Sequence, residues 1–540
     1  MASTASTQRR PAAAAVLEPV TGSDNDDDNN NEGVESQAVA RQAAEGRRIT
    51  RIVFIALLLD ILSFTIILPL LPRSLEAYKA REGSDPSTLL GWTLSQVAQL
   101  RHRILGWTTS RFLLQGARAD LVLLGGMLGS LYSLLQCVVA PVIGRVSDRL
   151  GRRRTLMVCM AGNVVWTVLW VFSRSFESFL LARVIAGLSE GNVQISNTVI
   201  ADVTDASSRS KGMALVGIAF AVGFTLGPSI GAYFSTKMSA EGSGGSALAP
   251  FAAAAVFSLA LLVTESLYLY FKLPETLHFK KSTDDDDDND KGGDAVSEKA
   301  AVITATTTTA TTKQASDNVR QVLRRLNVVH FAYLFFFSGM EYTLTFLTHD
   351  KFNFSNMQQG RLLGFIGITS TILQGGYVRR VKGKSAGRGD KSLVTQGMVG
   401  CTLGLLSIAL CCISADKSNS NSPSWWLWSG AVGFAVASAT VVNCLNSMVS
   451  LAGMSQQAAG DTGRRLGDFR SAGQIGRALG PVFACSVYWL SGAAVCYLVG
   501  AVAVAVITVA FIAAIPVTAI AANASGAAAL LPSPRSSKAK

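Results

Sequence analysis

The feature that most constrains this chain is a series of long apolar runs. A helix of about 20 apolar residues is needed to cross the roughly 30 Å hydrocarbon core of a bilayer, and runs of about 18 to 25 residues recur here. They predict membrane-spanning helices at 52–72, 121–143, 155–173, 178–201, 212–234, 249–272, 328–348, 360–378, 393–413, 425–450, 471–490 and 492–515. The sequence therefore predicts an all-α integral membrane protein with twelve spans.

The charged residues agree with a membrane environment. Only 16% of the residues are charged, whereas soluble domains carry about 25%. The net charge of +12 would fit a nucleic-acid partner. The basic residues, however, gather beside the predicted spans, which is typical of membrane topology. We therefore expect the lipid bilayer, and no nucleic acid, as the partner of this chain.

Polar segments divide the chain into two halves. Residues 1–50 are polar and are expected to form a disordered cytosolic tail, and 517–540 a second tail. The acidic and Thr-rich linker 273–327 separates a six-helix bundle at 51–272 from another at 328–516. Connectors 144–155 and 377–392 are rich in Lys and Arg, and such loops usually lie in the cytosol, so we expect both to be cytosolic. An even number of spans then places both termini in the cytosol.

The two halves share a glycine–proline motif, GFTLGPSIG in the fifth span and GRALGP in the eleventh. Such a repeat is typical of duplicated transporters, whose site lies where the halves meet. Small residues let helices approach closely, and proline removes a backbone hydrogen bond. Close helix packing alone could account for one copy of the motif. Its repetition in the second half favours a hinge, formed by Gly223, Gly227, Pro228, Gly231, Gly476, Gly480 and Pro481.

Polar residues in the fourth span predict a wet surface. On one continuous helix, a single face would carry Arg183, Gly187, Glu190, Gln194 and Asn197. Asp60 in the first span and Glu341 in the seventh add carboxylates. A charge at mid-span costs about 2.5–3.5 kcal/mol, so such residues face the bundle interior. They are candidates for substrate binding or proton coupling, and the alternative is an ion pair that fixes helix packing.

The segment after the second span, GRVSDRLGRR, resembles the signature loop of the major facilitator superfamily, and the whole chain resembles its drug:proton antiporter branch. The resemblance implies alternating access, a role of Arg183 with Gly187 in proton coupling, and an antiporter motif at Gly223, Gly227 and Pro228. The eukaryotic tetracycline-transporter-like group in this branch is associated with organic anions. The resemblance also implies a cytosolic gate at Gly144, Asp148, Arg149, Gly151 and Arg152, with Asp202 as an ion-pair partner.

The sequence thus predicts a monomeric secondary transporter for a small organic solute, either an anion or a drug-like molecule. A proton gradient is the expected driving force, and no cofactor or metal is expected. Neither a Walker A loop nor an HExxH motif occurs, so we do not expect an enzyme. The alternatives are a facilitative uniporter and a membrane receptor or scaffold that docks partners on its acidic linker.

Overall fold

The structure, a computed structural model, describes residues 24–67, 70–105, 116–204, 206–240, 252–277, 298–354, 356–382, 388–418, 425–452 and 462–515. These residues are helical throughout, apart from short connections, and contain no strand. Two compact units are distinguished, Met1–Glu45 and Gly46–Lys540. The contacts described below all lie within the second unit.

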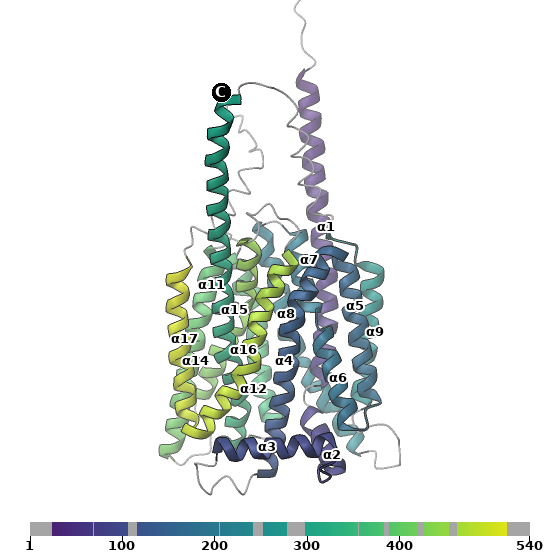
Figure 1. Cartoon of the computed structure of the whole chain (residues 1–540), viewed down its shortest axis with the longest axis vertical. Helices are drawn as coiled ribbons and strands as arrows, with labels where there is room; N and C mark the ends of the chain where they lie inside the picture. Colours follow the sequence, from purple (N-terminus) through teal and green to yellow (C-terminus); the bar gives the residue numbers. More distant parts are fainter. Residues whose placement is uncertain are drawn as a thin grey trace, which may run out of the picture. The chain divides into compact units, whose positions relative to one another are not determined.

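The helices of the first half cover five predicted spans singly and the fourth span as a pair (Figure 1). They are α1 (Asp24–Ile67), α2 (Leu71–Glu82), α3 (Leu89–Leu105), α4 (Gly116–Leu150), α5 (Arg152–Val171), α6 (Phe176–Ser189), α7 (Asn192–Val203), α8 (Ala206–Ala240) and α9 (Ala252–Lys272).

The second half continues with the remaining spans. It contains α11 (Glu298–Phe352), α12 (Asn356–Ile372), the π-helix η4 (Leu373–Val378), α13 (Arg379–Lys382), α14 (Arg388–Ser418), α15 (Trp425–Ala452), α16 (Thr462–Ser491) and α17 (Ala493–Ala514).

Every predicted span overlaps a helix. Eight helices within the described residues are individually long and apolar enough to cross a membrane: α1, α4, α5, α8, α9, α14, α15 and α17. The other four spans fall on α6 with α7, on α11, on α12 with η4, and on α16. All four carry charged residues within the predicted span, and the span on α12 also passes into a π-helix. Helices lined in this way face a bundle interior rather than lipid.

The prediction of one continuous helix at 178–201 is wrong. The chain leaves the helix at Glu190, where φ is −75° and ψ is 78°, and α7 starts after Gly191. A Cβ atom at Gly191 would lie 2.7 Å from Cys159 Sγ and 3.0 Å from Ile143. The chain therefore passes so close to α4 and α5 that only glycine fits at the break.

Helices also occur in segments that the sequence assigned to tails and loops. α1 begins at Asp24, inside the predicted tail 1–50, and α11 begins at Glu298, inside the predicted linker 273–327. The acidic run 284–290 and the tail 517–540 lie outside the described residues. The long connector 73–119 contains most of α2 and all of α3, which lie across one end of the spans (Figure 1).

The crosswise helices are tied to the first half. The Tyr78 hydroxyl lies 2.9 Å from Ser173 Oγ, and the Phe176 backbone N–H donates to Glu82 Oε2 at 3.2 Å. Burial raises the pKa of the Tyr78 phenol, as expected for a hydroxyl removed from water. These bonds attach α2 to the start of α6.

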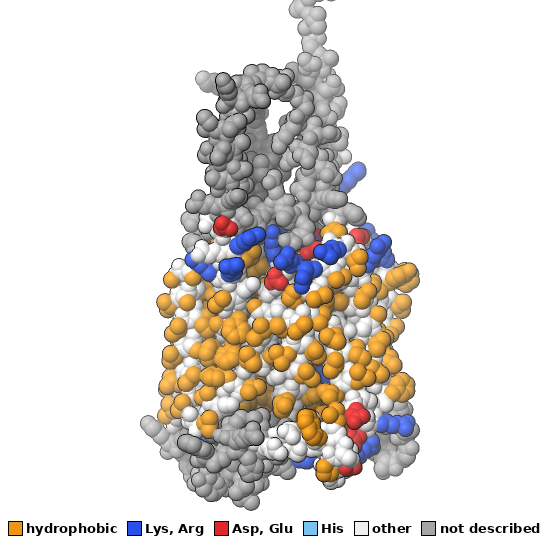
Figure 2. All heavy atoms as spheres, in the orientation of Figure 1, with side chains coloured by type: hydrophobic (Ala, Val, Ile, Leu, Met, Phe, Trp, Pro, Cys, Tyr) orange, Lys and Arg blue, Asp and Glu red, His pale blue; other side chains and the backbone are white. Residues whose placement is uncertain are grey.

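The outer surface of the unit is apolar in a band, and Lys and Arg side chains gather along the upper edge of that band (Figure 2). Large apolar side chains protrude there, including Val158 at 73% exposure and Phe271 at 74%. Monomeric soluble proteins rarely expose apolar patches this extensive. Arg149 and Arg154 are exposed where α4 ends and α5 begins, and Arg464 where α16 begins. We call this end of the spans the basic end.

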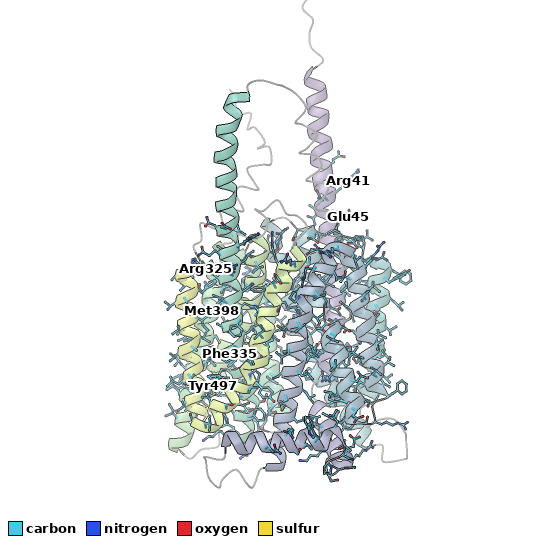
Figure 3. The ribbon with its side chains drawn as sticks, viewed as in Figure 1. Arg41, Glu45, Arg325, Phe335, Met398 and Tyr497 are labelled. Carbon is cyan, nitrogen blue, oxygen red and sulfur yellow. The ribbon has the colours of Figure 1, made fainter. Side chains whose placement is uncertain are left out.

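Each half has its own apolar core, and the repeated motif packs alike in both. In the first half a Cβ on Gly223 would meet Ile61, and one on Gly227 would meet Thr65, both on α1. In the second half Gly476 and Gly480 face backbone atoms of α11, the latter at Phe335 (Figure 3). The fifth span thus packs on the first as the eleventh packs on the seventh. Met398 of α14 and Tyr497 of α17 lie in the second core (Figure 3).

Candidate functional site

α4 of the first half and α16 of the second pack along each other, and we call their contact the α4–α16 seam. Small residues meet at each step, with Gly144 against Gly463 and Ala140 against Gly467. Farther along, Ser471 Oγ donates to the Cys137 carbonyl at 2.8 Å, and Ser130 Oγ to the Ala478 carbonyl at 2.8 Å. Small side chains permit this close approach, so the seam joins the two halves over much of their length.

At the basic end, Asp148 connects the two halves directly. Its carboxylate accepts the backbone N–H groups of Gly463 at 2.9 Å and Arg464 at 2.8 Å, both in the first turn of α16. The N-terminus of a helix carries partial positive charge and unpaired N–H donors, so a carboxylate is stabilised there. We call Asp148, Arg152 and Asp202, with this helix end, the latch.

Arg152 organises the latch from the first half. Its guanidinium bonds Asp148 at 2.6 Å and Asp202 at 2.7 Å, and it also donates to Ser147 at 2.9 Å. The side chain is 1% exposed. The structure thus brings together Asp148, Arg152 and Asp202. Arg149 is exposed and stands outside this cluster.

The two glycines of the signature loop are required by space and by backbone geometry. A Cβ on Gly144 would collide with the Gly463 carbonyl across the seam. Gly151 has φ of +99°, which L side chains rarely adopt, and it borders the Glu275 carboxylate that accepts the Arg152 backbone N–H at 2.8 Å. Glycine at these positions lets the loop reach both α16 and α5.

The structure contains a second contact between the halves at the basic end, which the sequence did not predict. Arg209 on α8 donates to the Ser450 carbonyl near the end of α15 at 3.4 Å, and to the Thr204 carbonyl after α7 at 2.9 Å. A cation is stabilised at the carboxyl end of a helix. Arg209 therefore mirrors Asp148 with the opposite charge.

The break between α6 and α7 gathers carboxylates in the middle of the spans. Asn192, the first residue of α7, donates its side-chain amide to Asp60 Oδ1 at 3.0 Å. Glu190 accepts from the Tyr132 hydroxyl of α4 at 3.3 Å, and its other oxygen lies 3.7 Å from Arg470 Nη2 of α16. We call Asp60, Asn192, Glu190, Tyr132 and Arg470 the central cluster. Discontinuous helices of this kind form the sites of many transporters.

Arg470 was not among the site residues predicted from the sequence. It lies one residue before the predicted eleventh span, outside the segments whose charged residues indicated a site. Arg477, inside that span, was also overlooked; it is exposed and interacts electrostatically with Glu341 of α11. The two arginines are seven residues apart on α16, which is about two helical turns. This spacing places both on one face and was the signal that could have revealed them.

Arg183 lies in a different environment from the central cluster. Its guanidinium sits 5.5 Å from the ring centre of Trp170 and 5.6 Å from that of Phe179. Its Nε atom is buried, and no hydrogen-bond partner for it is found within the described residues. Such cation–π contacts stabilise a cation among aromatic rings. Arg183 is thus held within the first half rather than at the seam.

The remaining candidates of the predicted polar face lie on α7. The Gln194 amide donates to the Ala140 carbonyl at 2.9 Å and reaches the seam beside Gly467. Asn197 is buried one turn farther along.

Glu265 on α9 is buried and interacts electrostatically with Asp60 and Glu190. Within the described residues, no group of three His, Cys, Asp or Glu side chains is arranged to hold a metal ion.

This arrangement combines the parts that a secondary transporter needs: two similar helical halves, a latch between them at one end, and a charged cluster at a helix break between them. The family model described as Major Facilitator Superfamily matches residues 53–481. The chain belongs to this superfamily of membrane transporters.

Individual relatives point the same way. Major facilitator superfamily domain-containing protein 10 of Mus musculus is 39% identical over 85% of this chain and 91% of the relative. The crystal structure of the human organic anion transporter MFSD10 (TETRAN) superposes on this chain with a TM-score of 0.68 and a sequence identity of 34%. The match covers 86% of this chain and 99% of that chain. The class B tetracycline resistance protein of Escherichia coli is 36% identical over 20% of this chain and 27% of the relative.

Proposed function

We propose that this chain carries small organic anions across a membrane by alternating access, and that the movement is coupled to protons. The observation that carries the proposal is the central cluster, in which ionisable side chains of both halves meet at a broken helix. A similar protein is described as a human organic anion transporter, which favours an anionic substrate here.

The basic end is proposed to face the cytosol, with both termini on that side. Its exposed arginines support this orientation because cytosolic connectors carry an excess of Lys and Arg. In this orientation the latch closes the cytosolic side. Alternating access then requires the Asp148 bonds to the start of α16 to open and re-form in each cycle.

Asp60 is the proposed proton carrier. It is buried in the first span, and its bond to Asn192 links it to the start of α7. A buried carboxylate can exchange a proton when its surroundings change. Arg183 is proposed to act indirectly, by holding α6 against Trp170 and Phe179. Gly223, Gly227, Pro228, Gly231, Gly476, Gly480 and Pro481 remain the proposed hinge.

The test is uptake into proteoliposomes under an imposed pH gradient, with labelled organic anions and matched organic cations. Wild type should accumulate an anion, and Asp60→Asn should abolish accumulation. Glu177→Gln is the matched control because Glu177 is an exposed carboxylate on α6, away from the cluster. Flux without accumulation in wild type would indicate a uniporter. A folded protein that moves no member of the panel would contradict the proposal.

A further inference from the structure

The guanidinium of Arg470 has unusually weak contacts for a charge between helices. Its Nη2 lies 3.7 Å from Glu190 and 3.5 Å from Gln136 Oε1. Its Nε is buried, and the described residues offer it no hydrogen-bond partner. Arginine has five N–H donors, and its bonds to carboxylates are ordinarily about 2.7–2.9 Å long. Arg470 therefore retains donors for a further anionic group.

Both members of this pair are partly exposed. The Arg470 side chain is 17% exposed and that of Glu190 is 15% exposed, whereas Asp60, Arg183 and Glu265 are buried. The pair also spans the two halves, because Glu190 stands at the α6–α7 break and Arg470 on α16. An anion bound at Arg470 would take the place that Glu190 now occupies.

Building on the proposed function, we infer that Arg470 binds the negative group of the transported organic anion, and that Glu190 competes for Arg470 until it takes up a proton. The substrate class is an organic carboxylate or sulfonate, because both present oxygens that match the planar guanidinium. When Glu190 accepts a proton from solvent, it becomes neutral and its attraction to Arg470 is lost. The guanidinium is then available to the anion.

The groups around the pair act on Glu190 in both directions. Arg470 favours its charged form, and the Tyr132 hydroxyl donates to it. Asp60 of α1 and Glu265 of α9 oppose that charge through space. Cys159 of α5 also interacts with Glu190, and on the other side Arg470 interacts with Arg477 and with His330 of α11.

Proton and anion binding are therefore linked. Because the anion requires neutral Glu190, its affinity rises as the pH falls, and anion binding draws a proton into the protein. Thermodynamic linkage makes these two effects reciprocal. Arg183, predicted from the sequence as a candidate for substrate binding or proton coupling, lacks this arrangement because its neighbours are aromatic rings.

The test measures binding of labelled benzenesulfonate to the purified full chain at several pH values. This probe stays an anion throughout, so any pH dependence belongs to the protein. Between about pH 8 and pH 5.5, wild type should bind more tightly as the pH falls. Glu190→Gln should bind with pH-independent affinity, on the order of tenfold tighter than wild type at the upper pH, within the usual range of coupling between sites. Arg470→Gln should weaken binding by on the order of a hundredfold, and Arg470→Lys by less.

Glu265→Gln is the matched control, since it removes a more deeply buried carboxylate that interacts with Glu190 through space, and it should keep the pH dependence. A pH indicator should report proton uptake on binding in wild type and none in Glu190→Gln. The inference fails if the affinity of wild type for the probe does not change with pH, or if Arg470→Gln binds the probe with wild-type affinity. It also fails if Glu190→Gln retains the pH dependence, which would point to another titrating group such as His330. Anion uptake that persists in Arg470→Gln would overturn this inference alone, whereas absence of any anion uptake by wild type would overturn the proposed function.

Discussion

The latch and the central cluster both connect the first half to α16, yet their ionic contacts differ in kind. At the start of α16, Asp148 and Arg152 take part in bonds of 2.6 to 2.9 Å, and Arg152 is 1% exposed. Farther along, Arg470 reaches Glu190 only at 3.7 Å and is 17% exposed. The first arrangement leaves little room for a ligand, whereas the second leaves donors unused.

This difference separates a structural contact from a binding site. A buried charge that lacks a partner is strongly destabilising, so a latch must saturate its charges to hold the halves together. A site that binds and releases an anion needs a cation whose resident partner can be displaced. The contrast can be tested by removing charges at each place and comparing the losses.

The largest effect is expected for Arg152→Ala. This change leaves Asp148 and Asp202 buried without their common cation, and removal of one partner from a buried pair costs about 3–5 kcal/mol. Arg470→Ala should cost less than Arg152→Ala, because the contact between Arg470 and Glu190 is 3.7 Å long and Glu190 keeps its bond to Tyr132. Thermal unfolding of the purified proteins in one detergent compares the two. Equal losses would remove the distinction between latch and site.

The sequence predicted the twelve spans and the residues of the latch, because apolar runs and the signature loop are local patterns. It did not predict the break at Glu190, since the close approach of Gly191 to Cys159 and Ile143 depends on tertiary packing. Arg470 was missed because its importance comes from Glu190, which is distant in the chain. Arg183 satisfied the motif, but only the structure shows the aromatic rings that surround it.

The next effect concerns the packing of the repeated glycine motif, on α8 in the first half and on α16 in the second. Gly480→Ala places a methyl group against the Phe335 backbone on α11, and Gly227→Ala places one against Thr65 on α1. Overpacking costs about 1–3 kcal/mol, and the repeat predicts similar losses in both halves. Gly129→Ala and Gly360→Ala are controls, because nothing lies within 4 Å of a Cβ at either position. Thermal unfolding should show the controls unchanged or slightly stabilised, and a loss in one half alone would argue against equivalent packing.

A smaller effect is expected when the latch is weakened without burying a new charge. Asp148→Asn keeps the shape of the side chain but removes the negative charge at the start of α16. Loss of a helix cap costs about 0.5–2 kcal/mol. Because Cys137 lies in the seam beside Ser471, its rate of maleimide labelling reports opening. In a variant with Cys137 as its only cysteine, Asp148→Asn should label several-fold faster. Arg149→Gln, outside the latch, should label at the original rate.

The smallest effect is expected at Arg477 and Glu341, the third level along α16. Both side chains are exposed in the structure and interact through space, and exposed pairs contribute about 0.2–1 kcal/mol. A double-mutant cycle with Arg477→Gln and Glu341→Gln should give a coupling in unfolding free energy within that range, and salt should reduce it. A coupling as large as that between Arg152 and Asp148 would mean that this pair is a second saturated contact. That result would contradict the expected weakening of ionic contacts from the latch along α16.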